Sequence, residues 1–202
     1  MHLAWQTSLL GSVEPSVDAA FTSAVRRPLD PSGDAWIDHV PGWVSGADEL
    51  FAELADRVEW QSPVVRMYDR MLDTPRLNGR VGHDIRPPVV EEMREQLSER
   101  YGMEFSSIGA NLYRDGRDSV AWHGDRVARE LPEACIAIVS LGGARRFLLR
   151  PKGGGPSVRL DLHSGDLLVM GGSCQRTWQH SVPKVARAEP RMSITFRHKY
   201  DD

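Results

Sequence analysis

Residues 134–150 read ACIAIVSLGGARRFLLR, two apolar runs of strand length separated by a pair of glycines. Short runs of the same kind, bounded by turn residues, follow one another from Gly102 to the C-terminus. They are SSIGANLYR (106–114), SVAWHG (119–124), SVRLDL (157–162), DLLVMGG (166–172), RTWQHSV (176–182) and RMSITFRH (191–198). Many short strands at this spacing predict a β-sandwich or barrel.

Two helices are predicted before these strands. Ser45 offers an N-cap to a helix over residues 46–58, in which large apolar residues recur at four-residue spacing. A second helix over residues 87–101 is bounded by proline in its first turn and by Gly102 at its end. We therefore expect an α+β fold that is mainly β: a double-sheet jelly roll with two or more helices packed on one sheet.

The rest of the N-terminal half is less regular. AWIDHV (35–40) alternates apolar and polar residues, as a half-buried strand does. Residues 60–86 show little periodicity and many arginines, which is typical of a functional loop. Residues 1–34 are expected to form an N-terminal extension that wraps a domain over residues 35–202.

The composition is that of an ordinary globular domain. The 202 residues are 41% hydrophobic and 26% charged. No signal-peptide pattern or membrane span is recognisable, and the two cysteines form no CxxC pair, so we expect a cytoplasmic protein, most simply a monomer. Residues 1–60 carry three arginines against ten acidic residues, whereas residues 61–202 carry 22 basic against 18 acidic residues. The later part could meet a polyanion, although arginine-rich composition also arises without one.

His123 and Asp125 are candidate metal ligands. They stand two residues apart on an extended segment, so their side chains share one face. His180 is the candidate third ligand, because a metal held by two histidines and one carboxylate keeps positions open for a co-substrate and oxygen. The alternative is that the histidine is structural, since an HxD pair is common by chance.

Polar residues also line one face of the strand predicted over residues 191–197. These are Arg191, Ser193, Thr195 and Arg197, and they alternate with apolar residues. Asn111 and Tyr113 share a face of an earlier strand in the same way. Two arginines on such a face are costly to bury without an anion, and a small dicarboxylate would pair with both. The alternative is a solvent-exposed strand face.

Three segments resemble the AlkB family of iron- and 2-oxoglutarate-dependent dioxygenases, in particular its DNA and RNA dealkylating members. The segments are NLYRDGRDSVAWHGD (111–125), DLLVMGGSCQRTWQHSVPK (166–184) and EPRMSITFRHKY (189–200), and the resemblance covers roughly residues 60–200. It implies a double-stranded β-helix of the jelly-roll type, with Fe(II), 2-oxoglutarate and O2 as cofactor and co-substrates. It also implies oxidative dealkylation of alkylated DNA or RNA bases, which releases succinate, carbon dioxide and formaldehyde.

The same resemblance implies the roles of the site residues. His123, Asp125 and His180 would hold the iron. Arg191 and Arg197 would hold the carboxylates of 2-oxoglutarate, helped by Asn111 and Tyr113, with Ser193 and Thr195 on the same strand face. Ser193 stands where the family motif RxNxTxR has asparagine, so we expect a weaker contact there.

The substrate side is expected to include Tyr68, Arg76, Trp122 and Arg126. Residues 67–88 offer Tyr68 and His83 to a base but are otherwise poor in aromatic residues, and their arginines, together with Arg66, could contact phosphates. Arg126, Val127 and Ala128 follow Asp125, where the dealkylases have an acidic residue that reads the base. A 2-oxoglutarate-dependent hydroxylase or demethylase of a non-nucleic-acid substrate therefore stays open, as does a jelly-roll binding protein without catalysis.

Overall fold

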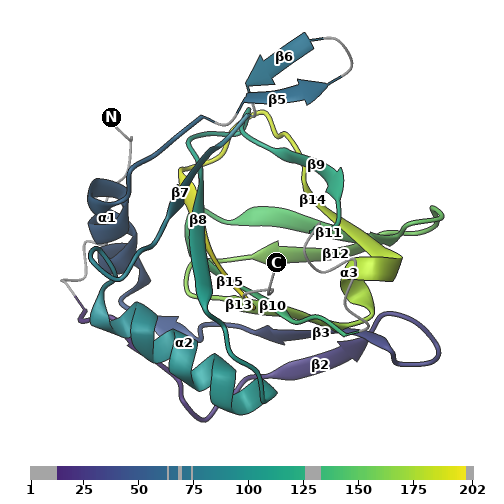
Figure 1. Cartoon of the computed structure of the whole chain (residues 1–202), viewed down its shortest axis with the longest axis horizontal. Coiled ribbons are helices and arrows are strands. Elements are labelled where there is room, and N and C mark those ends of the chain that lie inside the picture. Colours follow the sequence, from purple (N-terminus) through teal and green to yellow (C-terminus); the bar gives the residue numbers. More distant parts are fainter. Residues whose placement is uncertain (1–12, 63, 68–69, 74, 126–132, 199–202) are drawn as a thin grey trace.

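The computed structural model describes residues 13–198 except 63, 68–69, 74 and 126–132, and two antiparallel sheets packed face to face dominate it (Figure 1). The major sheet contains, from edge to edge, β2 (Val25–Pro28), β3 (Ala35–Val40), β13 (Leu167–Gly172), β10 (Ile136–Gly142), β15 (Arg191–Arg197), β8 (Ser107–Tyr113) and β7 (Leu77–Arg80). The minor sheet contains β12 (Val158–Leu162), β11 (Arg145–Pro151), β14 (Trp178–Val182) and β9 (Val120–His123). Since the chain passes repeatedly from one sheet to the other, this is the predicted jelly roll.

Strand β10 shows how the sequence produces the layers. All seven of its residues are buried, because both faces of the central strand are covered. Ile136 and Ile138 point between the sheets into a core that also contains Phe147 of β11. Val139 and Leu141 point to the other face, into a second core shared with the helices. One end of the space between the sheets is thus filled by apolar side chains, and the other end is left for the site described below.

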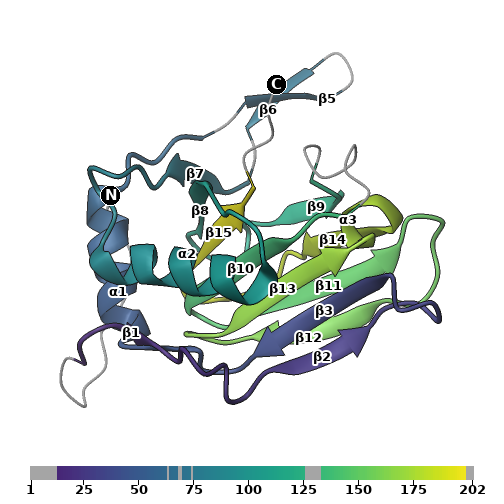
Figure 2. The same ribbon diagram turned by 60° about the horizontal axis from the view of Figure 1, so that its bottom comes forward.

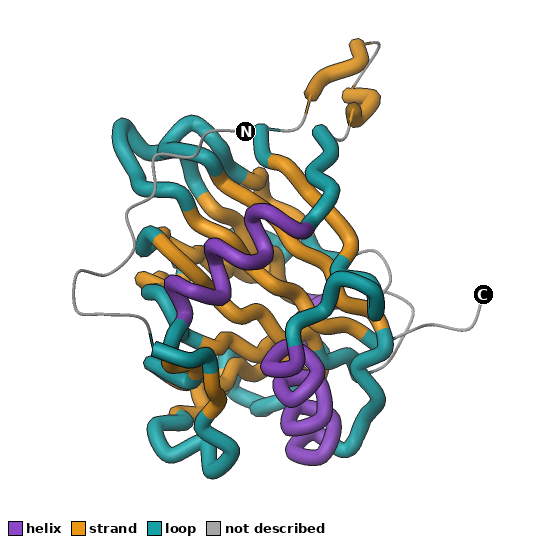
Figure 3. Tube along the Cα trace, turned by 90° about the vertical axis from the view of Figure 1, so that its left-hand side faces the viewer, coloured by secondary structure: helices purple, strands orange, loops and turns teal. Residues whose placement is uncertain are grey.

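Helices α1 (Ala47–Arg57) and α2 (Pro88–Tyr101) both cover the outer face of the major sheet (Figures 2 and 3). Leu50 of α1 and Met93 of α2 are fully buried in the second core. Both predicted helices are confirmed, and Gly102 ends α2 with φ at 65°. The predicted N-cap is wrong: Gly46, with φ at 62°, caps α1 in place of Ser45. A Cβ at this glycine would lie 2.3 Å from the backbone oxygen of Val13, so a tertiary contact selects the residue.

Residues 60–86 contain more regular structure than the sequence predicted. Strands β5 (Val64–Met67) and β6 (Arg70–Asp73) form a hairpin that projects from the body of the molecule, and β7 joins the edge of the major sheet (Figure 1). The hairpin pairs only with itself, which explains why its sequence lacks the alternation of a half-buried strand. Of the side chains of residues 63–74 nothing is described.

The described N-terminal residues add one short strand pair and one edge strand of the major sheet. Strand β1 (Ser16–Val17) pairs with β4 (Val44–Ser45), and β2 extends the major sheet by pairing with β3, the predicted AWIDHV strand. The division of the chain after residue 34 stays a prediction. In the described part of the chain, no helix has the length and apolar character needed to cross a membrane.

Candidate metal and co-substrate site

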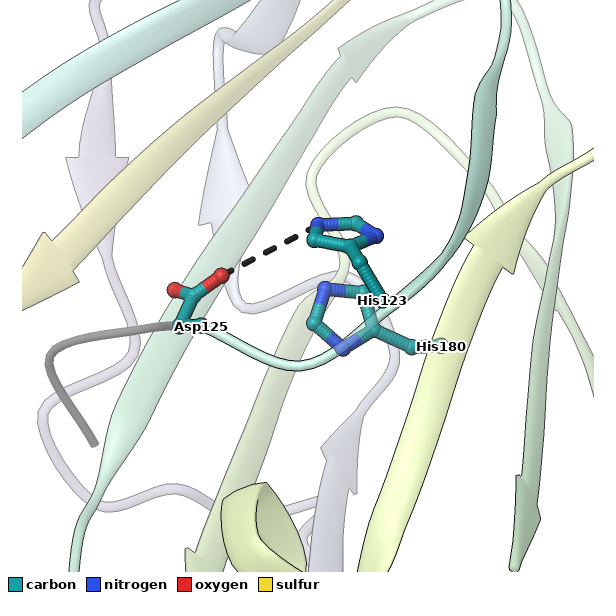
Figure 4. A group of neighbouring side chains, drawn as sticks. All are labelled: His123, Asp125 and His180. Atoms are coloured by element: carbon teal, nitrogen blue, oxygen red, sulfur yellow. Dashed lines mark ion pairs between the residues drawn. The ribbon is translucent and has the colours of Figure 1, made fainter. Parts of the chain in front are cut away.

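The three predicted metal ligands lie together (Figure 4). His123 ends β9 and stands in register with His180 on the neighbouring β14. Their ring centroids are 4.2 Å apart. Asp125 follows β9 by two residues, and one ligand atom from each of the three side chains lies within 4.8 Å of the others. Two imidazoles and one carboxylate are the donor set of the facial triad that holds non-haem iron.

Gly124 allows the chain to turn between His123 and Asp125. A Cβ at this position would lie 2.9 Å from the backbone oxygen of Gln175, in the short helix α3 (Cys174–Thr177). The side chain of Gln175 is buried, and its Oε1 accepts a hydrogen bond of 3.2 Å from the backbone N–H of Asp125. The close approach of two backbones, which only glycine permits, therefore fixes the position of the carboxylate.

The protonation states of the three side chains suit a metal. The Nδ1 of His123 lies 2.8 Å from the backbone oxygen of Ala121, so this nitrogen carries the proton and Nε2 is left facing Asp125 Oδ1 at 3.9 Å. Burial lowers the pKa of His123 and lowers that of His180 to about 3. Burial alone would raise the pKa of Asp125, but the charge of Arg197 and the hydrogen bond that it donates outweigh burial and lower that pKa. Neutral imidazoles beside a carboxylate are the forms that bind metal ions.

Two neighbours orient these ligands. The Nε of Arg197 donates a hydrogen bond of 2.7 Å to Oδ2 of Asp125, which leaves Oδ1 toward the histidines. The ring of Phe147 stacks on His180 with centroids 5.3 Å apart and an interplanar angle of 14°. Contacts of this kind restrict the rotation of a ligand before the metal arrives.

Arg191 is the strongest candidate for holding an anionic co-substrate. It is 1% exposed, and its Nη2 donates a hydrogen bond of 2.7 Å to Oγ of Ser140. Its Nε is buried without a hydrogen-bond partner, and its guanidinium carbon lies 5.2 Å from the centroid of the Tyr113 ring. Burial lowers the pKa of this guanidinium. A fully buried cation with an unused donor fits a carboxylate, and the alternative of a solvent-exposed strand face is wrong for this residue.

A cavity of about 150 Å³ is lined by the three predicted metal ligands and by the residues predicted to hold the co-substrate. Its lining includes every residue predicted to bind the metal or the co-substrate: His123, Asp125, His180, Asn111, Tyr113, Arg191, Ser193, Thr195 and Arg197. Strand pairing explains the gathering, because Asn111 pairs with Ser193 and Tyr113 with Arg191 across β8 and β15. Apolar side chains, among them Ile138 and Val182, complete the wall.

The sequence did not point to Arg145, which lies behind Tyr113. This arginine is 3% exposed and donates to the backbone oxygens of Asp115, Asp118 and Pro183 at 3.2, 2.9 and 2.8 Å. Its guanidinium carbon lies 5.5 Å from the centroid of the Tyr113 ring, so that ring has a buried cation in contact from two strands. The inward position of Arg145 on an alternating strand was the signal available. Ser140 and Gln175 were missed as well.

The predicted substrate residues have different outcomes. Arg76 lines both the site cavity and an adjoining groove of about 860 Å³. Trp122 lies on the outer face of the minor sheet, where the guanidinium carbon of Arg150 is 4.1 Å from its ring centroid. Since neighbours along a strand point to opposite faces and His123 points inward, Trp122 points away from the cavity, and its contact with the substrate stays a prediction. Tyr68 and Arg126 fall outside the described residues, as do Val127 and Ala128.

The arginines expected to contact phosphates also differ in their exposure. Arg80 is exposed and lines the groove, together with His83. The side chain of Arg86 is only 6% exposed and forms an ion pair with Glu91, so the prediction of a phosphate contact is wrong for this residue. The side chains of Arg66 and Arg70 fall outside the described part of the chain.

Comparisons with known proteins agree with this geometry. A family model described as the 2OG-Fe(II) oxygenase superfamily matches residues 82–197. The chain is 33% identical over 199 residues to alpha-ketoglutarate-dependent dioxygenase alkB homolog 3 of Bos taurus, covering 86% of this chain and 70% of that protein. It is 32% identical over 177 residues to the DNA oxidative demethylase ALKBH2 of Homo sapiens, covering 75% of this chain and 68% of that protein.

A solved structure shares the fold. The structure of OsALKBH1 superposes with a TM-score of 0.55 at 14% identity and covers 87% of this chain and 98% of its own. At this identity the likeness bears on the fold alone. The family match and the identities above show more: the chain belongs to the 2OG-Fe(II) oxygenase superfamily, as an AlkB-type dioxygenase that uses Fe(II), 2-oxoglutarate and O2.

Proposed function

We propose that this dioxygenase removes alkyl groups oxidatively from the bases of DNA or RNA. The observation that carries the proposal is the groove beside the site. Four of its lining residues are arginines, namely Arg57, Arg76, Arg80 and Arg197, whereas two are carboxylates, Glu59 and Asp84. An excess of cations along an open groove suits the phosphates of a nucleic-acid strand. The relative ALKBH2 is named a DNA oxidative demethylase, which agrees with this assignment.

Within this proposal, His123, Asp125 and His180 hold the iron, and the unused Nε of Arg191 supports its pairing with a carboxylate of 2-oxoglutarate. When bound, iron, 2-oxoglutarate and dioxygen together supply a two-electron oxidation that hydroxylates a C–H bond and yields succinate and carbon dioxide. On a carbon attached to a base nitrogen, the hydroxylated group leaves as an aldehyde. The C–N bond breaks, and the nitrogen keeps the electron pair.

The chain's own residues contribute orientation and exclusion of water. Arg197 keeps one carboxylate oxygen of Asp125 occupied, and Tyr113 is packed between Arg191 and Arg145. The apolar wall of the cavity, which includes Ile138 and Phe147, limits access of water to the reacting carbon. Asn111 and Arg76 line both the cavity and the groove, so a base entering along the groove meets the site there.

One observation favours a second candidate, hydroxylation of a substrate other than nucleic acid. Among the described residues that line the groove, none is Phe, Tyr or Trp, and the one aromatic ring is the imidazole of His83, although a flipped base is usually held by stacking on aromatic side chains. Nucleic acid stays the first candidate because the arginines of the groove are placed to contact phosphates, although Arg57 also pairs with Glu53 and Arg197 with Asp125. As to compartment, we propose a reducing cytoplasm, since Cys135 and Cys174 are both buried and unpaired, and we propose that the enzyme is a monomer there.

The test uses purified enzyme with Fe(II), 2-oxoglutarate and single-stranded oligonucleotides that carry N1-methyladenine or N3-methylcytosine. We expect formaldehyde and succinate in equal amounts, and we expect neither product from the His180→Ala variant. Double-stranded versions of the same oligonucleotides show which form is preferred. Succinate without formaldehyde on every methylated oligonucleotide would contradict the proposal and favour the second candidate.

A further inference from the structure

We propose that Gly109 sets the size of the alkyl group that this enzyme accepts, by leaving the floor of the groove open to bases with adducts larger than methyl. The inference rests on the proposed function, because it concerns which alkylated bases that function serves. It is carried by the position of one glycine in a strand next to the site.

Gly109 lies in the middle of β8, on the face that looks into the groove. It pairs with Thr195 of β15 on one side and with Arg80 of β7 on the other. Its neighbours Ile108 and Ala110 are buried in the core under the helices, so the face of Gly109 is that of Asn111. Asn111 lines both the site cavity and the groove, and two residues of strand separate it from Gly109 by about 7 Å.

Neither backbone conformation nor packing explains a glycine here. Its φ is not in the left-handed region, where glycine is favoured. A Cβ at Gly109 would meet only the backbone oxygen of Gly79, at 3.5 Å, which is an ordinary contact. Gly79 of β7, which pairs with Ala110, is different: a Cβ there would lie 2.3 Å from Cγ1 of Val58. A strand interior normally gains stability from a side chain, so Gly109 gives up stability for open space in the groove.

The residues around Gly109 decide which kind of group fits the open space. Ser107 lines the groove next along the same face, and Thr195, which lines the site cavity, pairs with Gly109; Arg80 and Arg197 also line the groove. A flat base can approach the backbone of β8 at the glycine while its phosphates stay near the guanidinium groups. Any side chain at position 109 would project into the volume that an ethyl or propyl group on the base requires.

The experiment compares the wild type with Gly109→Ala and Gly109→Val on single-stranded oligonucleotides that carry N1-methyl-, N1-ethyl- or N1-propyladenine. The carbon attached to nitrogen is hydroxylated in each case, so the products are formaldehyde, acetaldehyde and propanal. The readout is the ratio of kcat/KM for propyl over methyl, because a general loss of folding or activity does not change a ratio. Valine suits a strand, and alanine provides the milder variant if valine is not tolerated.

We expect the wild type to act on all three adducts and the propyl-to-methyl ratio to fall at least about tenfold in the valine variant, as expected when a pocket loses the space of a methylene. Gly153→Ala is the matched control, because a Cβ at this glycine meets no atom within 4 Å and its φ is not left-handed. An unchanged ratio in both Gly109 variants would overturn the inference alone, as would a wild type that accepts only methyl. A wild type that forms succinate but releases no aldehyde from any oligonucleotide would overturn the proposed function, and the inference with it.

Discussion

Replacing Arg191 by methionine should weaken 2-oxoglutarate binding without destabilising the protein that lacks it. Methionine keeps most of the length of the side chain and removes its charge. Arg191 is fully buried, its Nη2 donates a hydrogen bond to Oγ of Ser140, and burial lowers its pKa. The charge is therefore unfavourable until a carboxylate pairs with it. If Arg191 were only a structural residue, its replacement would destabilise the protein and leave 2-oxoglutarate binding unchanged.

The magnitudes follow from that pairing. A charge-assisted hydrogen bond contributes about 1.5–3 kcal/mol, so losing it should raise the Kd for 2-oxoglutarate by about 10- to 150-fold. At a concentration of 100 times the wild-type Kd, the ligand raises the free energy of unfolding by about 2.7 kcal/mol. If the variant binds 100-fold more weakly, the same concentration contributes only about 0.4 kcal/mol. Without ligand, the free energy of unfolding should change by less than about 1 kcal/mol or rise.

The assay is thermal unfolding with Mn²⁺ in place of iron, so that no turnover occurs, across a titration of 2-oxoglutarate. Arg146→Met is the matched control, because Arg146 is the exposed neighbour of Arg145 on the outer face of the minor sheet. The Nε of Arg146 lies 3.8 Å from Oδ1 of Asp161. We expect the control to keep the full ligand-induced rise in melting temperature. If Arg191→Met keeps this rise, or if it loses several kcal/mol of stability in the absence of ligand, the reasoning is refuted and Arg191 is structural.

Two further substitutions test the metal site and the fold. Gly124→Ala brings a Cβ to 2.9 Å from the backbone oxygen of Gln175, so Asp125 must shift; we expect Mn²⁺ affinity to fall about 10- to 100-fold in a calorimetric titration, and unchanged affinity would contradict the role of Gly124. Asp166 forms a hydrogen bond with Nε2 of His39 and accepts two more from the backbone N–H groups of His163 and Gly42; together these outweigh burial and lower its pKa. Because a lowered pKa stabilises the fold above the unfolded value of about 3.9, the stability difference between wild type and Asp166→Asn should be about 1–3 kcal/mol at neutral pH and shrink below about pH 4. Denaturant unfolding across pH measures it, and a difference independent of pH would contradict the charge argument.

Alternation along strands made much of this fold predictable. Strand β15 is the clearest example, because its polar residues face the site while Met192, Ile194 and Phe196 enter the core under the helices. The same alternation brought Arg191 and Tyr113 to the same face of the major sheet. The end of α2 at Gly102 and the strand AWIDHV were predictable from rules that are just as local.

What could not be predicted depends on contacts between distant residues. Gly46 replaces Ser45 as a cap because the chain near Val13 passes against it, and no local pattern contains that contact. Arg145 donates hydrogen bonds to three backbone oxygens in two separate loops, so strand alternation could indicate its inward position but not its partners. The outward direction of Trp122 depends on which face of β9 turns toward the site, and that is fixed by the pairing of β9 with β14.

The placement of the three ligands has a consequence for the motions of the minor sheet. Strand β9 is the edge of that sheet, and its pairing with β14 is irregular between the two register pairs that join them. An edge strand held in this way is among the first segments of a fold to open locally. His123 belongs to β9 and His180 to its neighbour, so a bound ion cross-links the two strands at the point where their ladder is weakest. A bound iron would thus close an edge of the sheet as well as serve the chemistry, and we expect the opening of that edge to set how readily the enzyme exchanges its metal.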